Sequence, residues 1–390
     1  MPPPTFFLSY SRDDLADIVV LARVLKIHGI RTWQDINNLG IGLSEDRIRQ
    51  AIRSDVTGLV FYSTAKSVSS QFVRCVELPE AERRHKVESA FCIVPVFRLA
   101  REETDMGLAD CVSVPVSNFN GAKVPEPADH LAVATAARRA AEIILETAFV
   151  PESSAMAVLA LSSKQRARTS VDLDLDFAPF FRAGLPGQDA WNGEFPAALM
   201  KVKSALIQRS VNRLRLHSYA HLSLGLLFGY VFRDRTGFQL EIEQTDKEKG
   251  KTIWPSDGEP TAHGITFREF PGTLGSKNLL VKLNLVAEDS LSVPAYTKEA
   301  GLVYRGTLEA MPPRYPYFVS GAQALAIARE LADKIKSLHG MYGTNEVHLF
   351  AAIPLGLAIL IGFNLNACGT VQCYEFDNST RRYYPSCLLT

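Results

Sequence analysis

The sequence predicts a mixed α/β protein in two parts, a parallel-sheet domain followed by a domain of two related lobes. Near the N-terminus, apolar strand-like segments alternate with amphipathic helical segments. Near the C-terminus, residues 216–226 align without gaps with residues 347–357. A length of 390 residues is also more than one ordinary core supports. We therefore expect a domain at 1–150, a linker at 151–168, and a domain at 169–390 whose repeats span 169–275 and 276–390.

The first 150 residues show the alternation of strands and helices that builds a parallel sheet covered on both faces. Each strand is a short apolar run, and each helix follows a polar start signal or precedes a glycine. The expected strands are residues 5–9, 30–36, 57–62, 90–97 and 112–116, and the expected helices are residues 15–28, 44–54 and 131–147.

Polar residues follow these strands directly. After the first strand come Tyr10, Ser11 and Arg12, after the second come Trp33 and Asp35, and a loop with Gly42 and Ser44 follows. Because parallel strands present their carboxyl ends at one edge of the sheet, we expect a ligand site there. Trp33 or Tyr10 is suited to stack on a base, and Arg12 is suited to pair with a pyrophosphate. The competing interpretations are that Trp33 is a core residue, Arg12 a solvated charge and Asp35 a turn former.

These residues resemble the TIR domain family over about residues 5–150. The segment 7–14 (Phe-Leu-Ser-Tyr-Ser-Arg-Asp-Asp) is similar to the family's first-strand box, and Trp33-x-Asp35 followed by Leu-Gly-Ile-Gly at 39–42 is similar to its second strand and BB loop. The resemblance implies a flavodoxin-like fold. In enzymatic members, a glutamate at the start of the third helix is needed to break the bond between nicotinamide and ribose in NAD.

Glu77 is the residue nearest to that catalytic position. The family setting is Ser-x-Trp-x-x-x-Glu, whereas this chain has Phe72 in place of the tryptophan, and the glutamate arrives one residue late after Ser70. One extra residue turns a helix by about 100°. A bulge or a later helix start would restore the position of Glu77. The alternatives are Glu80 as the catalytic residue, and a TIR scaffold without activity.

The C-terminal part contains the repeat. Each copy runs from an apolar strand through Ser223-Leu-Gly225 or Pro354-Leu-Gly356 into an apolar helix. Residues 171–177 and 279–286 are the expected strands ahead of each copy, with basic amphipathic helices at 197–212 and 322–339. We expect two fused Rossmann-like lobes about a pseudo-twofold axis. Backbone N–H groups at the two helix starts would then suit the phosphates of a symmetric ligand.

The segment from His348, with its closing strand at 371–377, resembles the SAVED domain of bacterial anti-phage CBASS effectors, itself similar to two fused CARF subunits. The resemblance spans about residues 169–390 and implies a sensor for a cyclic oligonucleotide, with a cyclic trinucleotide such as cyclic tri-AMP favoured. The expected contacts come from both copies and from an aromatic segment after a strand end: Phe180, Arg182, His221, Ser223, Gly225, Pro354 and Gly356.

Composition excludes several function classes. The 42 basic residues balance the 42 acidic residues, so no net charge draws the chain to duplex nucleic acid or to an anionic membrane. The six cysteines include no CxxC pair and no zinc-like cluster, which predicts no metal site. The apolar run at 347–363 is too short to span a bilayer and is expected to be a buried strand and helix. We expect a cytoplasmic protein.

Together these patterns predict a cyclic-oligonucleotide-activated NAD glycohydrolase of antiviral defence. NAD is its substrate, and no cofactor is expected. Ligand binding would drive self-association into an oligomer or a filament, in which neighbouring chains hold the glycine-containing loop at 37–42. The alternative is a ligand-gated TIR adaptor that recruits another protein and has no activity of its own.

Overall fold

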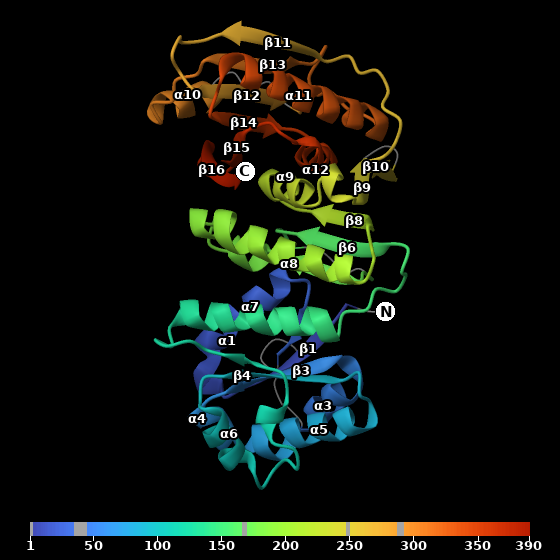
Figure 1. Ribbon diagram of the computed structural model, residues 1–390, viewed down its shortest axis with the longest axis vertical. Helices are drawn as coiled ribbons and strands as arrows, with labels where there is room; N and C mark the ends of the chain where they lie inside the picture. Colours follow the sequence, from blue (N-terminus) through green and yellow to red (C-terminus); the bar gives the residue numbers. More distant parts are fainter. Residues whose placement is uncertain (1–2, 35–44, 166–169, 247–249, 287–291) are drawn as a thin grey trace. The chain divides into compact units, whose positions relative to one another are not determined.

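The computed structural model of the chain describes residues 3–34, 45–165, 170–246, 250–286 and 292–390 (Figure 1). The chain divides into two compact units. The first holds most of the chain up to Ala160 together with residues 170–179 and Ser204–Arg209, and the second holds most of the remainder. The confirmed fold class is mixed α/β, with a parallel sheet in the N-terminal part.

The first sheet has five parallel strands in the order β2-β1-β3-β4-β5, which is the flavodoxin-like order. Its strands are β1 (Thr5–Ser9), β2 (Arg31–Trp33), β3 (Gly58–Ser63), β4 (Cys92–Phe97) and β5 (Ala122–Lys123). Every described residue of β3 is buried, because the sheet is covered on both faces.

Two cores flank this sheet. One lies under α1 (Leu15–Ile27) and α7 (His130–Thr147), and the other lies under the helices of the opposite face (Figure 1). The opposite face carries α3 (Glu45–Gln50), α4 (Ala65–Ser69), α5 (Leu78–Val87), α6 (Arg101–Leu108) and the π-helical turns η2 (Ala51–Asp55) and η3 (Val73–Glu77). Short 3-10 turns lie at η1 (Arg12–Asp14) and η4 (Val116–Asn118).

One predicted strand of this part is wrong. Residues 112–116 do not pair with the sheet; Val116 begins the turn η4, and the fifth strand is the later pair Ala122–Lys123. Pro115 lies inside the predicted segment and has no N–H to give to a ladder, which explains why an apolar run here forms no strand.

The remaining strands form two sheets, ordered β10-β9-β8-β6-β7 and β11-β13-β12-β14-β15-β16. The strands are β6 (Ala157–Ser162), β7 (Leu173–Asp176), β8 (Arg213–Tyr219), β9 (Gln239–Asp246), β10 (Gly250–Pro255), β11 (Thr266–Pro271), β12 (Asn278–Asn284), β13 (Gly306–Met311), β14 (Glu346–Ala352), β15 (Thr370–Asp377) and β16 (Arg382–Leu389). The helices are α8 (Phe195–Gln208), α9 (Leu222–Val231), α10 (Ser292–Glu299), α11 (Gly321–Tyr342) and α12 (Leu355–Asn364), with short turns η5 (Ala178–Phe180), η6 (Ala190–Glu194) and η7 (Asp234–Thr236).

The two sheets repeat one order of strands, which corrects the predicted repeat. Since β8 matches β14, the strand beside it, β6, matches β12, and β7 matches β13. The sequence instead predicts that the segment of β7 matches that of β12, and that the segment of β6 belongs to the linker at 151–168. The apolar sequence of β6 is instead buried in the sheet. The strand β11, which ends before the expected lobe boundary at residue 275, pairs with β13 of the second lobe.

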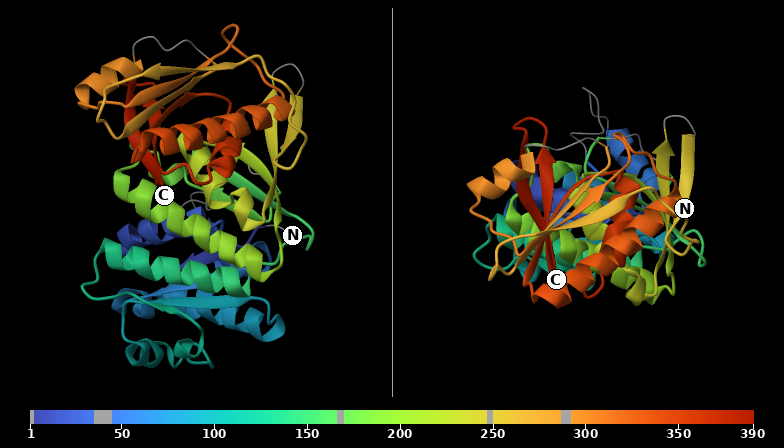
Figure 2. Two further views of the ribbon diagram at one scale, coloured as in Figure 1. Left: turned by 45° about the horizontal axis from the view of Figure 1, so that its top comes forward. Right: turned by 90° about the horizontal axis from the view of Figure 1, so that it is seen from above.

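The helices α9 and α12 pack directly against each other within the second unit. A Cβ atom at Gly229 would lie 2.0 Å from the carbonyl oxygen of Ile359, and one at Gly362 would lie 2.0 Å from that of Leu226. These reciprocal close approaches are what a pseudo-twofold axis between the two helices produces. Figure 2 shows the twisted strands of the third sheet, with α11 running alongside them.

Candidate functional site

The carboxyl ends of β1 and β3 lie where the strand order of the first sheet reverses, the place at which such sheets bind ligands. Ser9 is the last residue of β1, and its hydroxyl donates a hydrogen bond to Glu77 Oε2 at 2.6 Å. Only 7% of Glu77 is exposed. The structure therefore brings the carboxylate predicted to be catalytic to the sheet edge predicted to hold the site, while its catalytic role stays a prediction.

The π-helical turn η3 accounts for the late position of Glu77. A π turn closes its hydrogen bonds from residue i to i+5, so it holds one residue more than an α-helix over the same stretch. η3 ends at Glu77 and continues directly into α5. A π turn here is the kind of bulge that would take up the extra residue, and the match of Glu77 to the catalytic position of the family stays a prediction.

Glu80, the alternative catalytic residue, has a different environment. Its carboxylate is 2% exposed and is paired with arginines: Arg53 Nε donates to Oε1 at 2.9 Å and Arg53 Nη2 to Oε2 at 3.1 Å. Arg83 also donates to Oε1. Burial acts to raise the pKa of Glu80, but the hydrogen bonds from Arg53 and Arg83 outweigh it and lower the pKa. The Glu80 carboxylate is thus held in ion pairs with Arg53 and Arg83.

The predicted stacking residues lie in the two cores. The Trp33 ring stacks on Phe7 with centroids 4.9 Å apart and is buried under α3 and α5. Tyr10 is buried in the other core, under α1 and α7. The core interpretation of Trp33 is therefore the one that its packing supports, and the two rings do not share a face of the sheet.

The polar residues predicted for this site differ in exposure. Arg12 is exposed at the start of η1, and Ser11 before it is half-buried. Asp35, Gly42 and Ser44 lie outside the described residues.

A cleft that the sequence analysis missed lies at the same sheet edge, between the residues that follow β1, β3 and β4. Its volume is about 480 Å³, and its polar lining is Asp13, Asp14, Asp17, Thr64, Lys66 and Arg98. Thr64 Oγ1 donates to Asp14 Oδ2 at 2.7 Å, and Tyr62 donates to Asp17 Oδ2 at 2.8 Å. Burial raises the pKa of Asp14. The signal that could have found it is Arg98, which follows β4 directly.

In the second unit, the two helix starts are linked across the lobes. The Ser223 N–H, in the first turn of α9, donates to Glu375 Oε2 at 2.8 Å, and the Gly356 N–H of α12 donates to Gln244 Oε1 at 3.0 Å. Gln244 and Glu375 occupy equivalent places in β9 and β15, at the spacing of the repeat. These two N–H groups, predicted to face a phosphate, are satisfied inside the protein.

The glycines of both predicted turns also have close neighbours. A Cβ at Gly225 would lie 2.6 Å from Leu355, and one at Gly356 would lie 2.9 Å from Trp254. Pro354 provides the N-cap of α12 without a side-chain hydrogen bond. Side chains therefore pack closely against both glycines, whether or not a ligand binds.

His221 lies at the start of α9 in an aromatic cluster. Its ring stacks on Phe181 with centroids 4.2 Å apart, and its Nδ1 lies 2.7 Å from Ser163 Oγ. Burial, with a smaller effect from Lys164, lowers the pKa of His221 to about 4, so the ring is neutral at pH 7.

The other two predicted contacts differ in exposure. Phe180 packs edge to face against Phe195. Arg182, which follows Phe181 in the sequence, is exposed.

A second cavity that the sequence analysis missed lies in the lobe of the third sheet. Its volume is about 410 Å³, and its lining includes Tyr296, Glu299, Arg381, Arg382 and Tyr384. Arg382 pairs with Glu299 at 3.4 Å. The sequence signal is the run of two arginines and two tyrosines at 381–384, where the turn after β15 leads into β16.

The described part of the chain holds neither a metal-binding cluster nor a membrane-spanning helix. Among those residues, no group of three or more His, Cys, Asp or Glu could hold a metal ion. None of the helices there combines the length and hydropathy that crossing a membrane requires.

Family models match both parts of the chain. The TIR domain model matches residues 6–128, and the model described as "SMODS-associated and fused to various effectors sensor domain", SAVED, matches residues 199–389. This chain joins a TIR domain to a SAVED domain. The matched ranges leave the boundary between the two domains a prediction.

A solved structure supports the fold of this TIR-SAVED chain. The Acinetobacter baumannii Cap4 SAVED/CARF-domain containing receptor with the cyclic trinucleotide 3'3'3'-cAAA matches 99% of this chain and 88% of its own, with a TM-score of 0.51 and 15% identity. The same receptor with 2'3'3'-cAAA gives a TM-score of 0.49 at 15% identity, over 98% of this chain and 86% of its own. The curated proteins gave no match.

Proposed function

We propose that this TIR-SAVED protein is a cytoplasmic NAD glycohydrolase of antiviral defence that a cyclic oligonucleotide switches on. The observation that carries the proposal is the position of Glu77, a buried carboxylate bonded to Ser9 at the carboxyl end of β1. Ligands of flavodoxin-like sheets bind at that edge. NAD is the substrate, and no cofactor takes part.

The chemistry needs one well-placed carboxylate. When the bond between nicotinamide and ribose breaks, positive charge develops on the ribose as an oxocarbenium-like centre. A carboxylate beside that centre stabilises it electrostatically or traps it. Nicotinamide leaves as a neutral amine, so the leaving group does not require a strong acid. Water then gives ADP-ribose, or an internal nucleophile gives a cyclic product.

The ligand assignment rests on the SAVED domain. A structural relative carries a cyclic trinucleotide. We propose a cyclic trinucleotide such as cyclic tri-AMP. His221, Phe180 and Arg182 are the side chains proposed to contact it, with Ser223, Gly225, Pro354 and Gly356 shaping the turns behind them.

Self-association completes the proposal. Binding of the ligand brings TIR domains of neighbouring chains together, and activity then rises more steeply than linearly with protein concentration. Specific activity that stays flat across a hundredfold dilution at saturating ligand, while light scattering reports monomers, would replace assembly with a mechanism inside one chain.

The experiment is nicotinamide release from NAD by the purified full-length chain with a panel of cyclic di-, tri- and tetranucleotides. We expect release with one class of ligand and little without it, and calorimetry should give one ligand per chain. A ligand that binds without any release of nicotinamide would favour the adaptor. Absence of binding by the whole panel would contradict the ligand assignment.

A further inference from the structure

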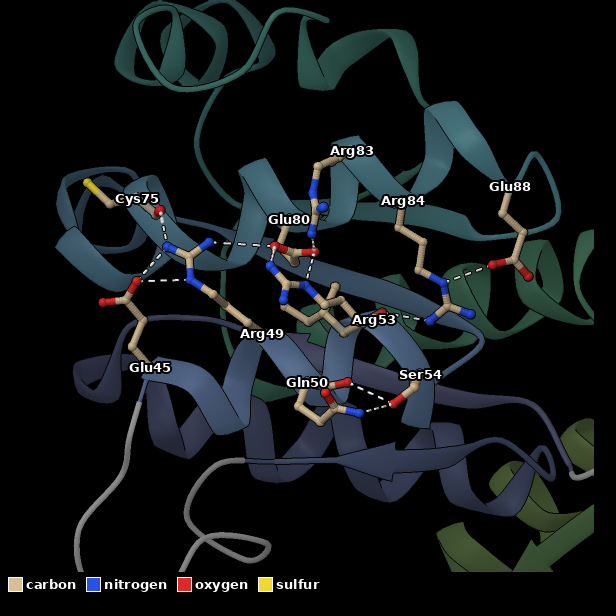
Figure 3. A network of polar contacts seen from close by, with 11 residues as sticks. Glu45, Arg49, Gln50, Arg53, Ser54, Cys75, Glu80, Arg83, Arg84 and Glu88 are labelled. Carbon is tan, nitrogen blue, oxygen red and sulfur yellow. Dashed lines mark hydrogen bonds and ion pairs between the residues drawn. The ribbon is translucent and has the colours of Figure 1, made fainter.

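The Glu80 cluster consists of one buried carboxylate and three arginines, Arg49, Arg53 and Arg83 (Figure 3). Arg53 approaches the carboxylate with two nitrogens, one to each oxygen. Arg49 Nη1 lies 3.5 Å from Glu80 Oε2. Three cations around one carboxylate that is 2% exposed are far more than is needed to neutralise it. The arrangement fixes geometry, because a two-pronged guanidinium holds a carboxylate in one orientation.

Two of the three arginine partners of Glu80 come from a segment earlier in the chain, and the third, Arg83, lies in the same helix as Glu80. Arg49 belongs to α3 and Arg53 to η2, whereas Glu80 lies in the first turn of α5. Arg84 of α5 also bonds to that earlier segment, because it donates to the carbonyl oxygens of Ile52 at 2.6 Å and Val56 at 2.7 Å. The start of α5 is therefore held against the end of the α3–η2 segment by side-chain bonds in both directions, as Figure 3 shows for the Glu80 side.

The same cluster reaches η3 itself. Arg49 Nη2 donates to the carbonyl oxygen of Cys75 at 3.4 Å, inside the turn that ends at Glu77. A π turn packs and bonds less favourably than α-helix, so its exact place depends on neighbours. From the sheet side, Ser9 fixes the Glu77 carboxylate at 2.6 Å. From the helix side, the Glu80 cluster fixes the backbone three residues later.

We propose that Glu80 is a positioning residue for Glu77: the Glu80 cluster sets the place of the π turn and so keeps the Glu77 carboxylate at the end of β1. The part of the proposal that concerns turnover rests on the proposed NAD cleavage. A carboxylate displaced by about 1 Å from a reacting centre loses about 10²-fold in rate. Glu80 itself contacts neither substrate nor the reacting atoms.

The test compares Glu80→Gln with Glu82→Gln in the full-length chain. Glu82 is a matched control because it lies in the same helix, is 8% exposed and is also held by several bonds, accepting from the N–H groups of Ser113 at 3.0 Å and Val114 at 2.9 Å. Its partners lie on a different segment from those of Glu80. Under saturating cyclic tri-AMP, we expect kcat of Glu80→Gln to fall about 10- to 100-fold with KM nearly unchanged. Glu82→Gln should keep kcat within about twofold.

A second readout does not depend on turnover. Amide hydrogen exchange at residues 73–77 should be faster in Glu80→Gln than in wild type, and unchanged in Glu82→Gln. Should Glu80→Gln fail to fold, Arg53→Lys keeps the charge, loses the two-pronged contact and should give the same exchange result.

Equal exchange in wild type, Glu80→Gln and Arg53→Lys would overturn the positioning role, as would equal loss of kcat in Glu80→Gln and Glu82→Gln. If wild type releases no nicotinamide with any ligand, the NAD chemistry fails. The exchange comparison still decides whether Glu80 places Glu77.

Discussion

Glu77 of the TIR domain and Glu375 of the SAVED domain look alike by local measures. Each is 7% exposed, and each accepts a hydrogen bond from a serine, Glu77 from the Ser9 hydroxyl and Glu375 from the Ser223 backbone N–H. They differ in what the bond accomplishes. Glu375 satisfies a backbone group in the first turn of α9, which would otherwise have no acceptor within the helix. Glu77 lies at the end of a π turn, at a sheet edge suited to ligands.

The comparison shows that burial and a hydrogen bond do not distinguish a structural carboxylate from one suited to chemistry. The element that carries the residue does. Glu375 lies in a paired β-strand and bonds across the two lobes, so removing it should cost stability. Glu77 lies in an irregular turn whose placement depends on neighbouring side chains, so removing it should cost activity.

The largest expected effect on stability comes from Glu375→Ala. Loss of the acceptor leaves a buried N–H at the start of α9 unpaired, and we expect the free energy of unfolding to fall by about 1.5–3 kcal/mol, as for a bond to a charged group. Gln244→Ala is the matched control at the equivalent place in the other lobe, where a neutral bond predicts about 0.5–1.5 kcal/mol. Urea unfolding followed by the fluorescence of Trp191 and Trp254 measures both.

Nicotinamide release by Glu375→Ala should stay close to wild type wherever the domain remains folded and ligand-bound. A loss of activity larger than the loss of folded protein would break the distinction between the two glutamates. Equal costs for Glu375→Ala and Gln244→Ala would show that the charge adds nothing to the bond.

A smaller effect is expected from pH. Burial raises the pKa of Glu375, so its contribution to the free energy of unfolding is present below its ordinary pKa of 4.5 and is lost as the pH rises through the raised value. His221 has the opposite sign: its pKa is lowered to about 4, so its contribution is present above 6.5 and is lost as the pH falls through about 4. For this partly exposed ring we expect about 2 kcal/mol.

Unfolding curves at pH 4.5, 6 and 7.5 separate the two groups. His221→Gln should remove the loss of stability on the acid side, and Glu375→Gln should remove the loss on the neutral side while keeping an acceptor for Ser223. Unchanged pH dependence in His221→Gln would mean that another group titrates in that range.

For the TIR domain, much of the fold could be predicted from the sequence. Apolar runs and polar breaks predicted four of the strands, and the family motif pointed to Glu77, whose catalytic role stays a prediction. The spacing of the motif could not reveal whether the extra residue rotates Glu77 away, because only the backbone shows that η3 absorbs it. Nor could the sequence show that Glu80 is held by Arg49 and Arg53, since these partners come from a segment that folding brings alongside.

For the SAVED domain, the repeat predicted two lobes but not their strand pairing. The segment of β6 is as apolar as a core strand, but the serine-rich residues around it favoured the prediction of a linker. Helix starts were also misleading. The sequence shows which backbone N–H groups are available, but Glu375 and Gln244 approach them only because the lobes pack across α9 and α12. Local sequence patterns cannot predict hydrogen-bond partners that come from the other lobe.

The most direct test of the account is the rate of nicotinamide release by Glu77→Gln, beside wild type, at saturating cyclic tri-AMP. The amide keeps the size of the side chain and an acceptor for Ser9 but lacks the charge that we propose stabilises the oxocarbenium-like centre. We predict a loss of at least about 10²-fold in kcat with unchanged ligand affinity and unchanged unfolding. Turnover within a few-fold of wild type would contradict the assignment of Glu77, and with it the claim that the π turn places the catalytic carboxylate.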